Sequence, residues 1–289
     1  MIRPALSIII LLCWAFGSTA WGEPMLLVNP QKLKEFKDRI GYEQVVFSPD
    51  PDVGVVADWD GVKEFLPTQE AGWEAFSEDV YGLAGGLVMR KWSFRRGTAT
   101  FILKVHVSSS GAQVARERFL SGVSTTSMAK IPYVRGPAWL GQLSVQMPGT
   151  PLQTVFWVFH NVFVELRDTS GISVEPMARS LQGFMERHVK KSVSQSLPRI
   201  DKVTVSKSMP HVDEEVVVQA HPKLSQPSQQ LRVEFQAKPE ELGLMKQSAT
   251  AFTYQALRPG RSTVEASLSD LKFLLMSQAQ VQVDIQPKK

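Results

Sequence analysis

Residues 254–267 read Tyr-Gln-Ala-Leu-Arg-Pro-Gly-Arg-Ser-Thr-Val-Glu-Ala-Ser and decide the fold of the C-terminal third of the chain. Apolar and polar side chains alternate on both sides of Pro259-Gly260, which is the pattern of two half-buried strands joined by a turn. About seven short strands of this kind predict a β-sandwich. The alternating runs are Val203/Val205, Val216/Val218/Ala220, Leu231/Val233/Phe235, Phe252/Tyr254, Val264/Ala266/Leu268 and Val281/Val283/Ile285.

The order of a strand, a Pro-Gly turn and a Thr-x-aliphatic strand in residues 254–267 resembles the late strands of bacterial immunoglobulin-like domains. The resemblance covers residues 199–287 only, and it implies an immunoglobulin-like sandwich. This span lacks the cysteine pair and the core tryptophan of antibody domains, so an antibody-type core is not expected. Such modules act as spacers, packing partners or binding surfaces, and the resemblance therefore implies no chemistry.

A polar, serine-rich stretch that ends in Pro198-Arg199 precedes the sandwich. Residues 191–199 follow a helical pattern and precede the alternating strands, so they are predicted to be a linker. Tryptophan usage changes at the same place, which indicates two separate cores. The predicted domains are residues 23–190 and 200–289. All five tryptophans after residue 22 precede the linker: Trp59, Trp73, Trp92, Trp139 and Trp157.

The first domain mixes helical and strand patterns. Apolar residues recur at helical spacing in residues 30–40 and 112–120, and Ser173 can cap a third helix that runs to about residue 189. Residues 59–66 and 71–83 can also carry helical segments. Strand-like runs cover residues 45–47, 87–94, 98–107, 142–147, 155–159 and 162–166.

A hairpin, a Ser-Gly loop and a helix occur twice in this domain. The two loops contain Ser110-Gly111 and Ser170-Gly171, which suggests a ββα pseudo-repeat, although the residues match poorly elsewhere and convergence is the alternative. Strand-rich units that are each followed by a helix predict an α+β domain with an antiparallel sheet and helices on one face.

The N-terminus has the order of a secretory signal. Arg3 precedes an apolar run from Ala5 to Phe16, small residues follow, and a signal peptide of residues 1–22 is predicted. Retention of this segment as a membrane anchor is the alternative. Cys13 is the only cysteine, so a cleaved chain contains no disulfide or thiol chemistry. We expect an exported protein of the periplasm, cell surface or extracellular space.

The chain carries no recognisable catalytic, cofactor or metal motif. Its histidines show no pair four residues apart with a glutamate, and no Gly-x-Ser-x-Gly elbow occurs. The prediction is therefore no catalytic residue, no cofactor and no metal. Removal of Arg3 with the signal leaves 31 basic and 28 acidic residues, a balance that does not indicate nucleic-acid binding.

One candidate binding surface remains, at the predicted hairpin of residues 87–107. Basic and aromatic residues are interleaved there, as in grooves that bind polyanions. The possible ligands are anionic polysaccharides or lipid headgroups, and the simpler interpretation is a half-buried strand with a basic tip. The candidate residues are Arg90, Trp92, Arg95 and Arg96.

These patterns favour an exported, non-enzymatic binding or adaptor protein of the bacterial cell envelope. Its expected partner is a protein or an envelope glycan, with no membrane span once the signal is removed. The alternative is an envelope hydrolase of glycans, lipids or esters with its site in the first domain. A hydrolase would bring His106 or His160 to an acid or a serine, whereas an adaptor would expose an apolar patch on one domain.

Overall fold

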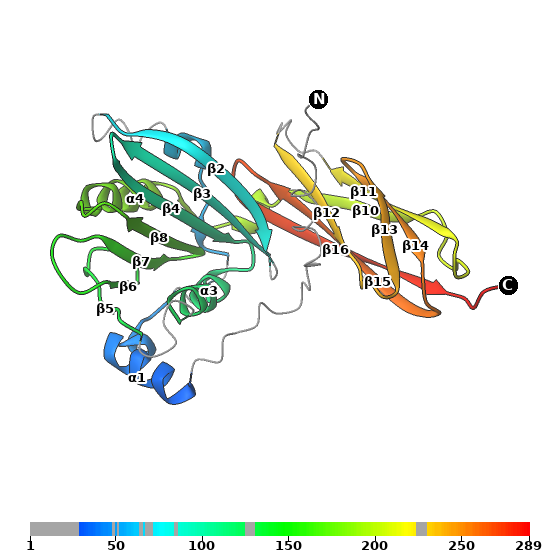
Figure 1. The fold of residues 1–289 in the computed structure, drawn as a ribbon, viewed down its shortest axis with the longest axis horizontal. Coiled ribbons are helices and arrows are strands. Elements are labelled where there is room, and N and C mark those ends of the chain that lie inside the picture. The colour runs from blue at the N-terminus through cyan, green and yellow to red at the C-terminus, as the bar shows by residue number, and fades with distance from the viewer. Residues whose placement is uncertain are drawn as a thin grey trace, which may run out of the picture.

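The computed structural model describes residues 29–47, 50, 52–63, 66, 72–83, 86–124, 131–223 and 230–289. The predicted signal peptide of residues 1–22 lies outside these ranges. A seven-stranded sheet with helices forms one part of the described chain, and a two-sheet sandwich forms the other (Figure 1).

The first domain is built on an antiparallel sheet of order β2-β3-β4-β8-β7-β6-β5. The predicted hairpins of residues 87–107 and 155–166 are confirmed, and their strands β4 and β8 pair at the centre of the sheet. The strands are β2 (Glu74–Leu83), β3 (Leu87–Arg96), β4 (Ala99–Ser108), β5 (Val134–Arg135), β6 (Leu143–Gln146), β7 (Thr154–Phe159) and β8 (Val162–Asp168).

Helices cover both faces of this sheet, so the expectation of helices on one face is wrong. α1 (Pro30–Ile40) and α3 (Ala112–Ser124) share a hydrophobic cluster with Phe156 and Val158 of β7. α4 (Glu175–Arg187) shares another cluster with Trp157, which points to the opposite face. Both faces of β7 are apolar, and a strand that is buried on both faces needs cover on both sides.

The two ββα units have the same order but a different arrangement. β4 and β8 are antiparallel neighbours, so a twofold axis that exchanges them must be perpendicular to the sheet. Such an axis would keep both helices on one face. Because α3 and α4 lie on opposite faces, twofold symmetry does not relate the units.

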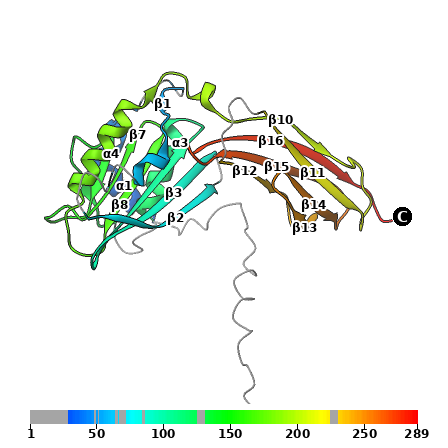
Figure 2. The same ribbon diagram turned by 90° about the horizontal axis from the view of Figure 1, so that it is seen from above.

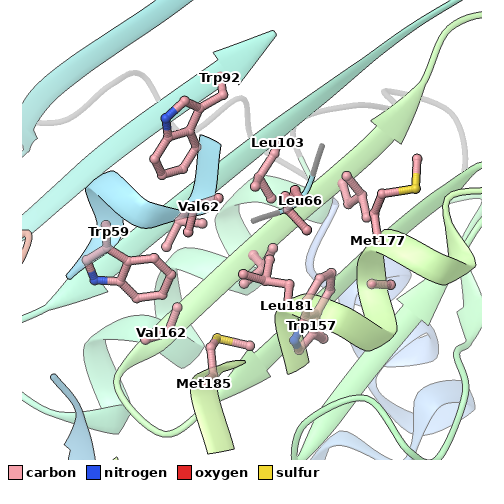
Figure 3. Packing of buried hydrophobic residues seen from close by; sticks show 14 of the residues in the cluster. Trp59, Val62, Leu66, Trp92, Leu103, Trp157, Val162, Met177, Leu181 and Met185 are labelled. Carbon is pink, nitrogen blue, oxygen red and sulfur yellow. The ribbon is translucent and has the colours of Figure 1, made fainter. Parts of the chain in front are cut away.

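The cluster under α4 is rich in tryptophan and methionine (Figure 3). Trp59, Trp92 and Trp157 are fully buried there, and the Trp59 ring meets the Phe184 ring edge-on at a centroid distance of 5.7 Å. Truncation of a buried tryptophan typically costs about 3–5 kcal/mol. This cluster therefore contributes much of the stability of the first domain.

The N-terminal segment and the predicted linker are tied to the same domain. β1 (Gly54–Val55) pairs with β9 (Val189–Lys190), and the buried Asn161 side chain accepts from the Val55 N–H at 2.7 Å. Within residues 191–199 lies the short helix η3 (Val193–Ser196), where Val193 is buried and donates its N–H to the Asp52 carbonyl. The other short helices are η1 (Tyr42–Gln44) and η2 (Trp59–Gly61).

Two local predictions for the first domain are wrong. Residues 45–47 form no strand, and the helical segment expected within residues 71–83 is replaced by strand β2. β2 lies at the edge of the sheet, where its ladder with β3 holds it extended. The helix prediction for residues 30–40 is confirmed, and the Asn29 side chain caps this helix by accepting from the Gln31 N–H.

The described residues of the C-terminal domain form seven strands, in sheets of order β10-β11-β14-β13 and β12-β15-β16. Strands A-B-E-D and C-F-G of immunoglobulin constant domains follow the same order. Apolar residues from both sheets form one cluster between them, which includes Val218 and Val264. The strands are β10 (Arg199–Val205), β11 (Glu215–Lys223), β12 (Leu231–Gln236), β13 (Leu242–Gln247), β14 (Ala251–Ala256), β15 (Gly260–Asp270) and β16 (Leu275–Ile285).

Candidate functional site

The tip of the β15–β16 hairpin joins the two domains. Leu274, Leu275 and Met276 are buried in the same cluster as the tryptophans of the first domain. The Met276 N–H donates to the Ser109 hydroxyl at 2.7 Å. Figure 2 shows both strands running from the sandwich towards β3, which β16 contacts. The sandwich therefore completes the core of the first domain.

Leu274 has an unusual backbone conformation at this tip. Its φ is 56°, in the left-handed region that branched side chains rarely adopt, and its side chain is fully buried. The neighbouring Lys272 carbonyl accepts from the Trp59 N–H at 2.9 Å. Burial in the first domain thus holds the turn in a conformation that a free hairpin would not favour.

The contact between hairpin residues 271–276 and the first domain is the joint of the two domains, and Arg90 lies at its polar centre. It is 3% exposed, its Nε donates to Glu78 at 2.6 Å, and its Nη2 donates to Asp60 at 2.6 Å. Its Nη1 reaches the Leu271 carbonyl of the hairpin at 3.3 Å. Gln230, from the sandwich, donates to the other Asp60 oxygen at 2.8 Å. Arg90 therefore links the domains by pairing with two acids and one carbonyl.

These contacts change the titration of Asp60. Burial alone would raise the pKa of this carboxyl, but the hydrogen bond and the positive charge of Arg90 outweigh that effect, together with the hydrogen bond from Gln230. The net result is a lowered pKa, so the ionised form of Asp60 stabilises the folded state.

The four residues of the predicted binding surface do not form one surface. Trp92 is fully buried, and the Arg90 guanidinium lies 5.1 Å from its ring centroid. Only Arg95 and Arg96 are exposed at the hairpin tip, where Arg95 pairs with Glu74 at 2.7 Å. Alternation along the strand places Arg90 and Trp92 on one face. The side chains that bury Arg90 and Trp92 come from distant segments of the chain. Ligand binding at Arg95 and Arg96 stays a prediction.

His106 and His160 do not meet a catalytic partner in the part of the chain that the structure describes. His106 is 2% exposed and stacks on Phe163 at 4.9 Å, and Arg118 Nε approaches its Nδ1 at 3.5 Å. Burial, aided by the charges of Arg118 and Lys104, lowers its pKa well below the ordinary value. Burial also lowers the pKa of His160. Within the described part of the chain, no hydrogen bond joins either histidine ring to an acid or a serine.

An exposed apolar edge lies on the sandwich, away from the joint. Leu244 and Met245 of β13 are 53% and 58% exposed, and Leu257 beside them is 43% exposed. β13 is the last strand of its sheet, and within the described residues it pairs with β14 alone. Three large apolar side chains are thus exposed on or beside a strand that has one free edge.

The ladder shows which main-chain groups of β13 face this free edge. The Leu257 N–H donates to the Glu241 carbonyl, so Glu241 and Gly243 face β14 in the alternation of an antiparallel pair. Leu242 and Leu244 then direct their main-chain groups outwards, and the register of the ladder shifts just after them, between Leu244 and Lys246. The Leu242 N–H is occupied by the Lys238 carbonyl, which leaves the Leu244 N–H and two carbonyls for a further strand.

A hollow of about 630 Å³ opens at the C-terminal end of α1, on the first domain. Arg39 and Arg135 line it together with Gln44, Gln142 and the exposed Val46. The sequence carries no motif for this hollow, because its walls come from segments about a hundred residues apart in the chain.

The described residues contain no helix long and apolar enough to span a membrane and no group of three side chains that could hold a metal ion. No protein-family model and no curated protein matches the chain. Among solved structures, the chain is similar to fibronectin(III)-like modules of CbhA from Clostridium thermocellum, with 18% identity, 32% of this chain and 100% of that chain covered, and a TM-score of 0.23.

Two further structures are similar at the same level. The PKD domain from the KIAA 1837 protein shows 16% identity over 30% of this chain and 88% of that chain, with a TM-score of 0.24. The endo-fucoidan hydrolase MfFcnA4 from glycoside hydrolase family 107 shows 9% identity over 74% of this chain and 24% of that chain, also with a TM-score of 0.24. The first two matches are to immunoglobulin-like folds and span about 30% of the chain.

Proposed function

We propose that this chain is an exported, non-enzymatic adaptor of the bacterial cell envelope that binds a protein partner along β13. The observation that carries the proposal is the free edge of β13, where Leu244, Met245 and Leu257 are exposed. An edge strand with exposed apolar side chains favours the addition of a further strand. The immunoglobulin-like sandwich would then be the part of the protein that recruits the partner.

The organisation of the sandwich supports this division of roles. Its β15–β16 tip is buried in the first domain, and that contact is satisfied by hydrogen bonds and apolar packing. Its other sheet ends at β13, whose outward main-chain groups include the Leu244 N–H and carbonyl. The hairpin tip of one sheet is therefore used for internal packing, and the β13 edge of the other sheet is available to a partner.

The contacts of the histidines favour an adaptor over a hydrolase. A histidine that acts as a general base must reach the group whose proton it removes. His106 is instead enclosed by Phe163, and the Arg118 guanidinium lies next to its Nδ1. Its lowered pKa follows from burial and needs no catalytic explanation.

Export is the part of the proposal that rests on the sequence of residues 1–22. Cell fractionation of the full chain tests it, since we expect the protein outside the cytoplasm with this segment removed. Recovery of an uncleaved chain from the cytoplasm would contradict export. This result would leave strand addition at β13 to be tested separately.

Site-specific photo-crosslinking tests the binding edge. A photoreactive residue replaces Met245 in the full chain, and the control carries it at Met209, which is 62% exposed in the same domain. In the native envelope we expect one discrete adduct from position 245, lost when Leu244→Lys is added, and none from position 209. Equal labelling at both positions, or an adduct that survives Leu244→Lys, would overturn the proposal.

A further inference from the structure

The hollow at the C-terminal end of α1 is a feature of the first domain that the proposed adaptor function does not use. It lies between the last turn of the helix and the edge strand β5, and its volume is about 630 Å³. Sites for small ligands commonly have volumes of about 300–1,000 Å³. The hollow is therefore large enough for the end of a peptide.

Two guanidinium groups are fixed at this hollow by hydrogen bonds that run in both directions between α1 and residues 131–135. Arg39 Nη2 donates to the Ile131 and Tyr133 carbonyls at 2.7 and 3.0 Å. Arg135 Nη1 donates to the Ile40 carbonyl at the end of α1 at 2.7 Å. A guanidinium has five N–H donors, so both arginines keep donors beyond these bonds. Their position is thus set without using up their capacity to bind an anion.

The charges around the hollow are unbalanced. The acid that lines it is Asp38, and Lys34 already pairs with this carboxylate at 2.7 Å. Among the described residues that line the hollow, the two cations Arg39 and Arg135 therefore face one acid, which already has a cationic partner. Two like charges that line one hollow repel each other, and a bound anion would reduce that repulsion.

The other lining groups narrow the class of anion. Gln142 accepts from the His160 N–H through its Oε1, so its amide NH₂ keeps two donors. Ile40, Val45 and Val46 supply an aliphatic wall, and no aromatic ring of the described residues lines the hollow for a sugar to stack on. This set of groups suits a carboxylate that is attached to an aliphatic side chain.

We propose that the hollow binds the C-terminal carboxylate of a peptide whose last side chain is aliphatic. The guanidinium forks of Arg39 and Arg135 would hold the carboxylate, since planar forks match its two oxygens. The aliphatic side chain would pack on Val45 and Val46. The site belongs to the first domain and does not depend on strand addition at β13.

Isothermal titration calorimetry of the full chain tests this site with three probes. The first is an N-acetylated tripeptide that ends in valine with a free carboxylate, the second is its C-terminal amide, and the third is digalacturonate. We expect the free acid to bind at least about tenfold more tightly than the amide. Equal binding of acid and amide, or tighter binding of digalacturonate, would overturn the proposal.

Variants at Val46 keep the test independent of folding. Val46 is 85% exposed and forms no side-chain hydrogen bond, so Val46→Glu adds a negative charge while Val46→Gln adds a neutral side chain of similar size. We expect Val46→Glu to weaken binding of the free acid at least about tenfold relative to Val46→Gln. Arg135→Gln should do the same, and Arg258→Gln, in the sandwich, should not. Equal affinity of the two Val46 variants would contradict the site.

Discussion

Two parts of the sandwich differ in what surrounds them, namely the β15–β16 tip and the β13 edge. At the tip, Leu274 and Leu275 are fully buried in the first domain, whereas on β13 Leu244 is 53% exposed. The Met276 N–H at the tip has a partner in Ser109, whereas the Leu244 N–H faces the free edge. The first is a finished interface within the chain, and the second is an exposed edge at which we propose that a partner strand binds.

The largest difference between the two parts is expected from leucine truncation. Leu275→Ala should lower the free energy of unfolding by about 2–5 kcal/mol, because it opens a cavity in a closed core. Leu244→Ala should change it by less than about 0.5 kcal/mol, since that side chain is exposed.

Urea unfolding followed by tryptophan fluorescence measures both variants. All five tryptophans after residue 22 precede residue 199, so the signal reports on the first domain although Leu275 belongs to the sandwich. A Leu275→Ala protein whose tryptophan transition stays at the wild-type midpoint would show that the hairpin tip does not support the first-domain core.

The polar half of the joint should give the next largest effect. Arg90→Met leaves Asp60 and Glu78 without their shared cation, and we expect a loss of about 2–3 kcal/mol, since both acids keep some contact with water. The matched control is Arg95→Met, whose exposed pair with Glu74 is worth at most about 1 kcal/mol. Equal losses in urea unfolding would show that Arg90 contributes no more than a surface ion pair.

Acid should weaken the joint through Asp60. Burial raises the pKa of this carboxyl, but the hydrogen bond and charge of Arg90 outweigh that effect, so the pKa is lowered. The contribution of Asp60 to the free energy of unfolding is therefore complete above the ordinary aspartate pKa of about 3.9, and it is lost as the pH falls below that value. Asp60→Asn should therefore be clearly less stable than the wild type at neutral pH, and the gap should narrow near pH 3. Thermal unfolding at the two pH values checks this, and a constant gap would contradict it.

The smallest change in stability is expected at β13. Leu244→Lys with Met245→Lys should alter the free energy of unfolding by less than about 0.5 kcal/mol per site, because both side chains already face water. In the crosslinking experiment, where position 245 carries the photoreactive residue, Leu244→Lys alone should abolish the adduct. Met209→Lys provides the exposed control in the same domain. A loss of stability comparable to that of Leu275→Ala would show that the edge is part of the fold.

Much of the fold follows from local patterns. The strands around Pro259-Gly260 alternate clearly, and the hairpin turns at Gly97 and at His160-Asn161 interrupt apolar runs. β2 was not predicted as a strand, because an edge strand that is partly exposed on both faces lacks regular alternation. The cover of both sheet faces was also missed, although residues 155–158 are apolar without interruption.

The joint and the two candidate sites depend on contacts between distant segments. The run Leu271-Lys-Phe-Leu-Leu-Met276 is apolar where a hairpin turn would ordinarily be polar, and this was the local signal for the joint. Arg90 and Trp92 were expected on one strand face, but the acids and the hairpin that cover them cannot be read from their neighbours. β13 lies outside the alternating runs, and its edge position follows from the sheet order.

Amide hydrogen exchange of the full chain tests the difference between the two interfaces most directly. We expect slow exchange at Met276 and Trp59, whose N–H groups donate across the joint, and fast exchange at Leu244, whose N–H faces the free edge. Exchange at Met276 as fast as that at Leu244 would contradict a finished interface at the hairpin tip. Slow exchange at Leu244 in the isolated protein would contradict a free edge on β13.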